Sequence, residues 1–263
     1  YEEKGLTVQE MLLARSGARL GKYAVPFFTQ LCTLLQRKLA ITMRNPLAIV
    51  LPLLIPAALG AAVGFMFRGV GNEGLMEQIS FVFVLVTLLG LGGLGLMPIL
   101  IEARHYMKLE TSETLYTEAA SVLSSFLVDV PLAFMGAAFE VLVCFVISGM
   151  DVEHLVTIFT WSMLLFFFYD SLFGLVAACA QDGQQAMSVA TAPLAVCLLC
   201  NGFFIPAPKA PDFVKMIFPI SPNYYAMQAI VYDLCQSAEN PFFKDFFLTY
   251  TGFTDEHGLQ GVL

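Results

Sequence analysis

The chain has 263 residues, of which 58% are hydrophobic and only 13% carry a charged side chain. Soluble domains are about 45–50% apolar and about 25% charged, so this composition excludes an ordinary soluble domain and indicates an integral membrane protein. The net charge of -8 argues against a nucleic-acid partner, which would require a basic surface. We therefore expect an all-α bundle of about five membrane-spanning helices within the lipid bilayer.

The first part of the chain is polar. Residues 1–25 carry mixed charge and scattered glycines, and they are predicted to be a linker. Residues 26–46 place apolar side chains at three- to four-residue spacing and end in basic residues, which is typical of an amphipathic helix along a membrane surface. The chain begins without Met, so we expect it to be a segment of a longer protein.

Five apolar stretches between residues 47 and 205 are predicted to cross the membrane as helices. They are residues 47–67, 79–101, 119–147, 155–180 and 186–205. Gly60 and Gly64 form a GxxxG pattern, which lets a second helix approach closely but is also common by chance in apolar helices. The GxGxxG pattern from Gly90 to Gly95 lies inside an uncharged span, so we assign it to helix packing and not to dinucleotide binding.

Residues 206–263 form a long mixed region after the last predicted crossing. Its apolar patches, 216–220 and 224–231, are too short to cross a membrane and are predicted to be re-entrant or interfacial. Basic residues gather before the first crossing and between the second and third crossings. The positive-inside rule therefore predicts a cytoplasmic N-terminus and an extracytoplasmic position for residues 206–263.

Acidic side chains within the predicted crossings are candidates for function, because an ionisable group is costly in the bilayer. They are Asp129, Glu140 and Asp170. They could serve transport or gating, or they could be protonated or paired with polar neighbours such as Tyr169 or Ser171. Asp129, near the end of a long helix, could also lie at headgroup level.

The sequence shows no motif for a catalytic or metal site. It contains no GxxxxGK[ST], HExxH or GxSxG pattern, and its three histidines are scattered along the chain. No pair of cysteines has the spacing of metal ligands. We therefore predict no catalytic residue, no metal and no cofactor in this segment, and expect a pore or carrier domain that lacks its own source of energy.

Four stretches carry a resemblance to a known family. They are residues 28–46, which end in Arg44-Asn-Pro46; the series Glu102, Tyr106, Lys108, Glu110 and Tyr116; Asp129-Val-Pro131; and Ser188-Val-Ala-Thr191 with Asn201-Gly-Phe-Phe204 and Pro219-Ile-Ser-Pro222-Asn-Tyr-Tyr225. They resemble the membrane domain of ABC transporters of the G subfamily, the White or pleiotropic-drug-resistance group of ABC-2 type. Ala103, where a basic residue is usual, and Thr117, where Arg is common, depart from the family pattern.

The resemblance implies an ATP-driven transporter that exports lipids, sterols or other hydrophobic compounds. ATP and Mg would bind a nucleotide-binding domain upstream in the same polypeptide, outside this segment. Coupling to that domain is expected from Glu102, Arg104, Tyr106, Glu110 and Tyr116. A second membrane domain, identical or different, would face this one.

The resemblance also assigns two sets of aromatic residues. Phe81 and Phe83 would line a central substrate cavity, and Phe203 and Phe204 would form an outer gate. These rings could instead meet lipid or anchor the helix ends at the membrane interface. The alternative function is an ion- or proton-coupled carrier that uses Glu140 and Asp170.

Overall fold

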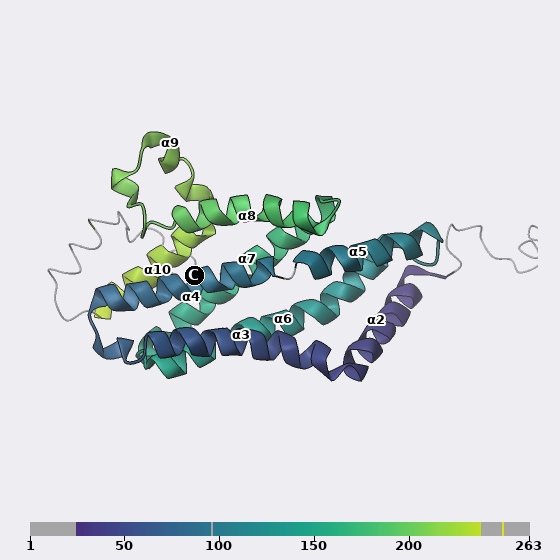
Figure 1. Ribbon diagram of the computed structural model, residues 1–263, viewed down its shortest axis with the longest axis horizontal. Coiled ribbons are helices and arrows are strands. Elements are labelled where there is room, and N and C mark those ends of the chain that lie inside the picture. Colours follow the sequence, from purple (N-terminus) through teal and green to yellow (C-terminus); the bar gives the residue numbers. More distant parts are fainter. Residues whose placement is uncertain (1–24, 96, 238–248, 250–263) are drawn as a thin grey trace, which may run out of the picture.

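The computed structural model describes residues 25–95, 97–237 and 249, and within them it contains helices and no strand (Figure 1). The helices are α2 (Phe27–Arg44), α3 (Pro46–Met66), α4 (Leu75–Leu94), α5 (Met97–Ser112), α6 (Glu118–Ser148), α7 (Leu155–Cys179), α8 (Gly183–Leu199), α9 (Asp212–Lys215) and α10 (Pro222–Ser237). Short 3-10 turns lie at Val70–Asn72, Val152–His154, Ala207–Lys209 and Phe218–Ile220. Most of the predicted linker and the last part of the 206–263 region lie outside the described residues.

Four helical segments in the described chain are long and apolar enough to cross a membrane. They are Pro46–Asn72, Leu75–Leu94, Glu118–Ser148 and Val152–Cys179. The apolar helix α8 has 17 residues, which is about 25 Å at 1.5 Å per residue and the lower limit for a crossing. These segments confirm the predicted all-α membrane bundle.

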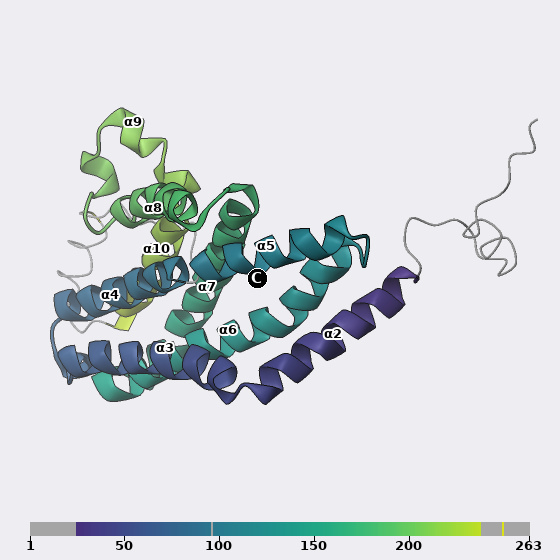
Figure 2. The ribbon, with the colours of Figure 1, turned by 45° about the vertical axis from the view of Figure 1, so that its right-hand side comes forward.

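The helices form two packed groups (Figures 1 and 2). In the first, α3 lies along α6, and α2 packs against α6 at the end of the bundle that also carries α5. In the second, α4, α7, α8 and α10 pack on one another. The groups meet where α6 contacts α7, while α5 contacts α6 on one side and α7 and α8 on the other. The polar helix α5 is therefore placed between them.

Glycines allow the closest helix contacts. A Cβ atom added at Gly60 of α3 would overlap the main-chain oxygen of Glu140 in α6, and one at Gly136 of α6 would overlap the main-chain oxygen of Pro52. Gly64 is also in tight contact with α6. The GxxxG pattern therefore mediates packing between α3 and α6. In α4, Gly93 lies against the ring of Phe173, which confirms that the second glycine pattern serves helix packing.

Two predicted crossings end in the wrong place. The span 79–101 is not continuous, because α4 ends at Leu94 and α5 begins at Met97. Gly92, Gly93 and Gly95 weaken the helix here, and Pro98, which lacks an N–H, suits the first turn of a new helix. The span 186–205 is also wrong at its end, because α8 stops at Leu199 and the chain turns at Gly202, whose φ is +82°.

Helix α10 is packed into the second group. Met227, Ile230 and Leu234 are fully buried against α4, α7 and α8. The Tyr169 hydroxyl donates a 2.8 Å hydrogen bond to Asn223 Oδ1 at the start of α10, and His154 Nδ1 lies 2.8 Å from Asp233 Oδ2 near its end. The apolar patch 224–231 therefore belongs to the core, whereas Met216 and Ile220 of the other patch are exposed.

Candidate functional site

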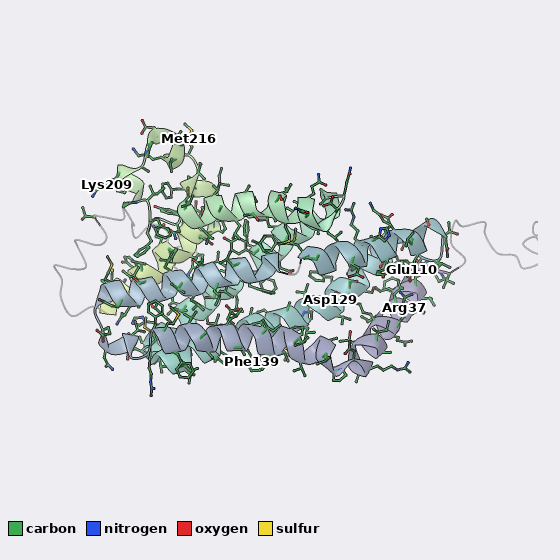
Figure 3. All side chains as sticks on the ribbon, in the orientation of Figure 1. Arg37, Glu110, Asp129, Phe139, Lys209 and Met216 are labelled. Carbon is green, nitrogen blue, oxygen red and sulfur yellow. The ribbon has the colours of Figure 1, made fainter. Side chains whose placement is uncertain are left out.

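The α5 end of the bundle holds a network of polar side chains between α2, α5 and the turn before α6. Arg37 Nη2 of α2 donates to both carboxylate oxygens of Glu110, at 3.0 Å each, and the Tyr116 hydroxyl donates to Glu110 Oε2 at 2.5 Å. These hydrogen bonds, from Tyr116 first and then Arg37, hold the pKa of Glu110 below its usual value. Burial and the bond to Glu110 raise the pKa of Tyr116, so its hydroxyl remains a donor. The pair Arg37–Glu110 is labelled in Figure 3.

Two more contacts fix α2 to the same region. Gln30 is only 7% exposed, and its Oε1 accepts hydrogen bonds from Thr117 N at 3.0 Å and Thr117 Oγ1 at 3.2 Å. Thr117 in turn caps α6 by accepting from Ala120 N. Lys38 of α2 forms an ion pair with Asp129 of α6. The side of α2 that faces α6 therefore carries polar as well as apolar side chains, while Phe27 and Leu39 of its predicted apolar face are exposed.

Arg104 points to the interior of the bundle. Its Nη1 donates to the main-chain oxygen of Ala177 at 2.9 Å and to that of Ala180 at 2.6 Å, where α7 ends. The last carbonyl groups of a helix have no partner within the helix, and a cation near them is favourable. Arg104 thus provides hydrogen-bond donors for the free carbonyl oxygens at the end of α7 and joins this end to α5.

The opposite side of α5 is open. The exposed stripe of α5 consists of Glu102, Tyr106 and Leu109, which recur every three or four residues and so share one face, and the exposed Glu113 lies in the turn directly after the helix. Tyr106 is 59% and Leu109 is 53% exposed. The predicted coupling residues therefore divide into two kinds: Glu102 and Tyr106 on the open face, and Arg104, Glu110 and Tyr116 in contacts within the chain.

The predicted cavity and gate residues come together in part. The ring of Phe83 in α4 stacks on Phe203 with centroids 5.4 Å apart and meets Phe204 edge-on at 4.8 Å. Asn201 arranges the two rings, because its Oδ1 accepts from the main-chain N–H groups of Phe203 at 2.9 Å and Phe204 at 3.3 Å.

The prediction for Phe81 is wrong in this structure. Its side chain is completely buried and meets the ring of Phe67 at 5.7 Å, so it lies in the chain's own core and lines no cavity.

The three acidic residues of the predicted crossings have different surroundings. Asp129 of α6, labelled in Figure 3, forms the ion pair with Lys38 of α2. Glu140 is 5% exposed, and its Oε1 has no hydrogen-bond partner among the described residues. Asp170 is half-buried. Its neighbour Tyr169, which was a possible partner, donates its hydroxyl to Asn223.

Sequence reasoning missed the partners of α2 and of Arg104. Gln30, Lys38 and Arg104 bind groups that lie more than seventy residues away in the chain, and Arg104 and Ala177, for example, are 73 residues apart. A local signal existed for Arg104, because it falls on the opposite side of the helix from Glu102 and Tyr106 at 3.6 residues per turn. Among the described residues, no group of His, Cys, Asp and Glu could hold a metal ion.

Comparison with known proteins places this arrangement in a family. The family described as "ABC-2 type transporter" matches residues 29–234. "ABC transporter G family member 3" of Dictyostelium discoideum is 27% identical over 205 residues, which is 73% of this chain and 14% of that protein. "Brefeldin A resistance protein" of Schizosaccharomyces pombe is 25% identical over 223 residues, 81% of this chain and 14% of that protein.

A third relative, "ABC multidrug transporter atrI" of Aspergillus fumigatus, is 25% identical over 212 residues, or 78% of this chain and 14% of the relative. The chain thus spans about one seventh of the length of these three proteins. The family match runs from α2 into α10 and so includes both packed groups and the polar helix between them. On this match, the chain belongs to the ABC-2 type transporter family as an integral, multi-pass membrane domain.

Proposed function

We propose that this chain is the membrane domain of an ATP-driven transporter that exports lipids, sterols or other hydrophobic compounds. The observation that carries the proposal is α5, a polar helix between the two groups, which is anchored on both sides within the chain and open on its third side. A helix so placed can receive a displacement from outside and pass it to both groups.

The partner at the exposed stripe of α5 would be a nucleotide-binding domain of the same polypeptide, with ATP and Mg bound there. Tyr106 and Leu109 offer apolar contact area, and Glu102 and Glu113 flank them with charge. Arg37, Arg44 and Lys108 lie in α2 and α5 at this end, which supports a cytoplasmic position by the positive-inside rule.

A second membrane domain, identical or different, would cover the open sides of α4 and α8. Gln184, Ser188 and Thr191 are exposed on α8 although this helix belongs to the membrane bundle. The Ser188 and Thr191 hydroxyls donate to main-chain oxygens of their own helix, whereas the exposed amide of Gln184 would be costly in lipid, which supports a partner or an aqueous cavity on this side. Phe83, half-buried, would then meet cargo near the outer end of α8.

Removing both gate rings tests the aromatic cluster. We expect Phe203→Ala with Phe204→Ala to change basal ATPase activity and export by about threefold or more in the complete transporter, because the barrier above the cavity is lost. Phe213→Ala is the matched control, since this ring is 70% exposed on α9. If the double variant behaves like the parent, the rings are interface anchors and the gate lies elsewhere.

The second candidate is an ion- or proton-coupled carrier, and the buried, unpartnered oxygen of Glu140 favours it. The full protein in vesicles separates the two functions. We expect ATP, and not an ion gradient, to drive transport, and we expect Glu140→Gln with Asp170→Asn to retain at least about half of it. Transport that needs a gradient and both carboxylates, but no ATP, would establish the carrier instead.

A further inference from the structure

The N-terminal half of α5 is attached to the connection between α7 and α8. Arg104 spans the end of α7 with its two hydrogen bonds to Ala177 and Ala180, both of which are buried. At Gly183, the first residue of α8, an added Cβ would be 3.8 Å from Pro98 Cα, which is van der Waals contact. Helix α5 therefore touches the end of one helix and the start of the next.

The C-terminal half of α5 is attached to the other group of helices. Glu110 binds Arg37 of α2, and α2 packs along α6. The two attachments lie six residues apart in α5 and on different sides of it, because Arg104 and Glu110 are separated by about 120° around the helix axis. Neither attachment uses a residue of the exposed stripe of α5, although Glu110 lies one turn after Tyr106.

We infer that Arg104 is a positioning residue that makes α5 and the α7–α8 connection move as one body during transport. The inference rests on the proposed function, and it gives Arg104 a different role from contact with the nucleotide-binding domain. A displacement of α5 would reach α8 through Arg104, and α8 carries the polar face that would border the cavity. A guanidinium suits this role because it stays charged and can donate to two carbonyl oxygens at once.

The first experiment compares transport with ATP hydrolysis in the complete transporter. We expect Arg104→Gln to keep basal ATPase activity within about twofold of the parent and to reduce compound exported per ATP hydrolysed by about tenfold. Arg104→Lys, which retains a cationic donor, should recover a large part of this ratio. Lys108→Gln is the control, because Lys108 is an exposed cation on the same helix, one turn after Arg104.

A parent-like export ratio for Arg104→Gln would overturn the inference and leave the proposed function standing. A parent that exports without ATP would instead overturn the proposed function. The two failures are therefore distinguishable in one assay.

A cross-link tests the same inference without depending on the folding of Arg104→Gln. Pro98→Cys and Gly183→Cys, with Cys32 and Cys179 replaced by Ser, place two thiols at the contact between α5 and α8. If α5 and the connection move together, the oxidised protein should retain at least about half of the export of its reduced form. Export that stops on oxidation and returns on reduction would show that they separate, and would overturn the inference.

Discussion

Introducing Asp at both Tyr106 and Leu109 is expected to lower ATP-dependent transport by at least about tenfold while the protein remains folded in the membrane. Both side chains are more than half exposed, so the change removes no contact of the core. Apolar and aromatic residues at the centre of an interface typically contribute about 2 kcal/mol or more each, and a buried unpaired carboxylate adds a further penalty. Transport and ATPase assays on the complete protein in vesicles measure the effect.

Lys108→Asp is the matched control for this prediction. It changes the charge of the same exposed helix by a similar amount, but Lys108 lies about 130° around the axis from the centre of the stripe. The control should transport like the parent. If it fails as badly as the double variant, the effect is one of charge on α5, and the stripe is not a docking surface.

Gly60→Ala and Gly136→Ala are each expected to destabilise the domain by about 1–3 kcal/mol. The added methyl would overlap a main-chain oxygen of the facing helix, and main chain cannot turn aside as a flexible side chain can. Helices α3 and α6 would have to move apart along their length. A lower midpoint of thermal denaturation in detergent, together with a lower yield of monodisperse protein, would register the change.

Gly174→Ala is expected to stabilise the domain instead. Apart from the main chain of α7 itself and the two adjacent residues, no atom would lie within 4 Å of a Cβ added at Gly174, so alanine is accommodated and the unfolded chain loses freedom. Such a replacement typically stabilises by about 0.4–1 kcal/mol. Equal stabilisation by all three alanines would mean that helix propensity, and not close packing, sets the effect.

Hydropathy located most of the spans because a crossing requires a long apolar stretch. The predicted spans 47–67, 119–147 and 155–180 differ from α3, α6 and α7 by a single residue at any end. Span 79–101 failed because the residues on both sides of the break are apolar, and apolar content does not report where the backbone changes direction. The glycines before the break and Pro98 after it carried that signal, but Pro52 and Pro56 lie inside the continuous helix α3, so residue type alone did not mark the break.

Contacts between segments that lie far apart in the chain could not be predicted from the sequence. The 16 residues of α10 are too few and too polar to predict a crossing, yet they fill part of the core because neighbouring helices supply partners for Asn223 and Asp233. The placement of Phe81 in the core and of Phe83 at the surface depends on which side of α4 meets α7. The sequence of α4 alone does not indicate which of its sides packs against α7.

The glycine contact between α3 and α6 also bears on how the domain is made. Chains are synthesised at about 5–20 residues per second, so Gly136 emerges from the ribosome roughly 4–15 seconds after Gly60. Two intervening helices, α4 and α5, are completed during that interval. The surface of α3 that later packs against α6 must meanwhile be covered by lipid or by the insertion machinery, so the closest helix contact of the finished domain forms only after α4 and α5 have been made.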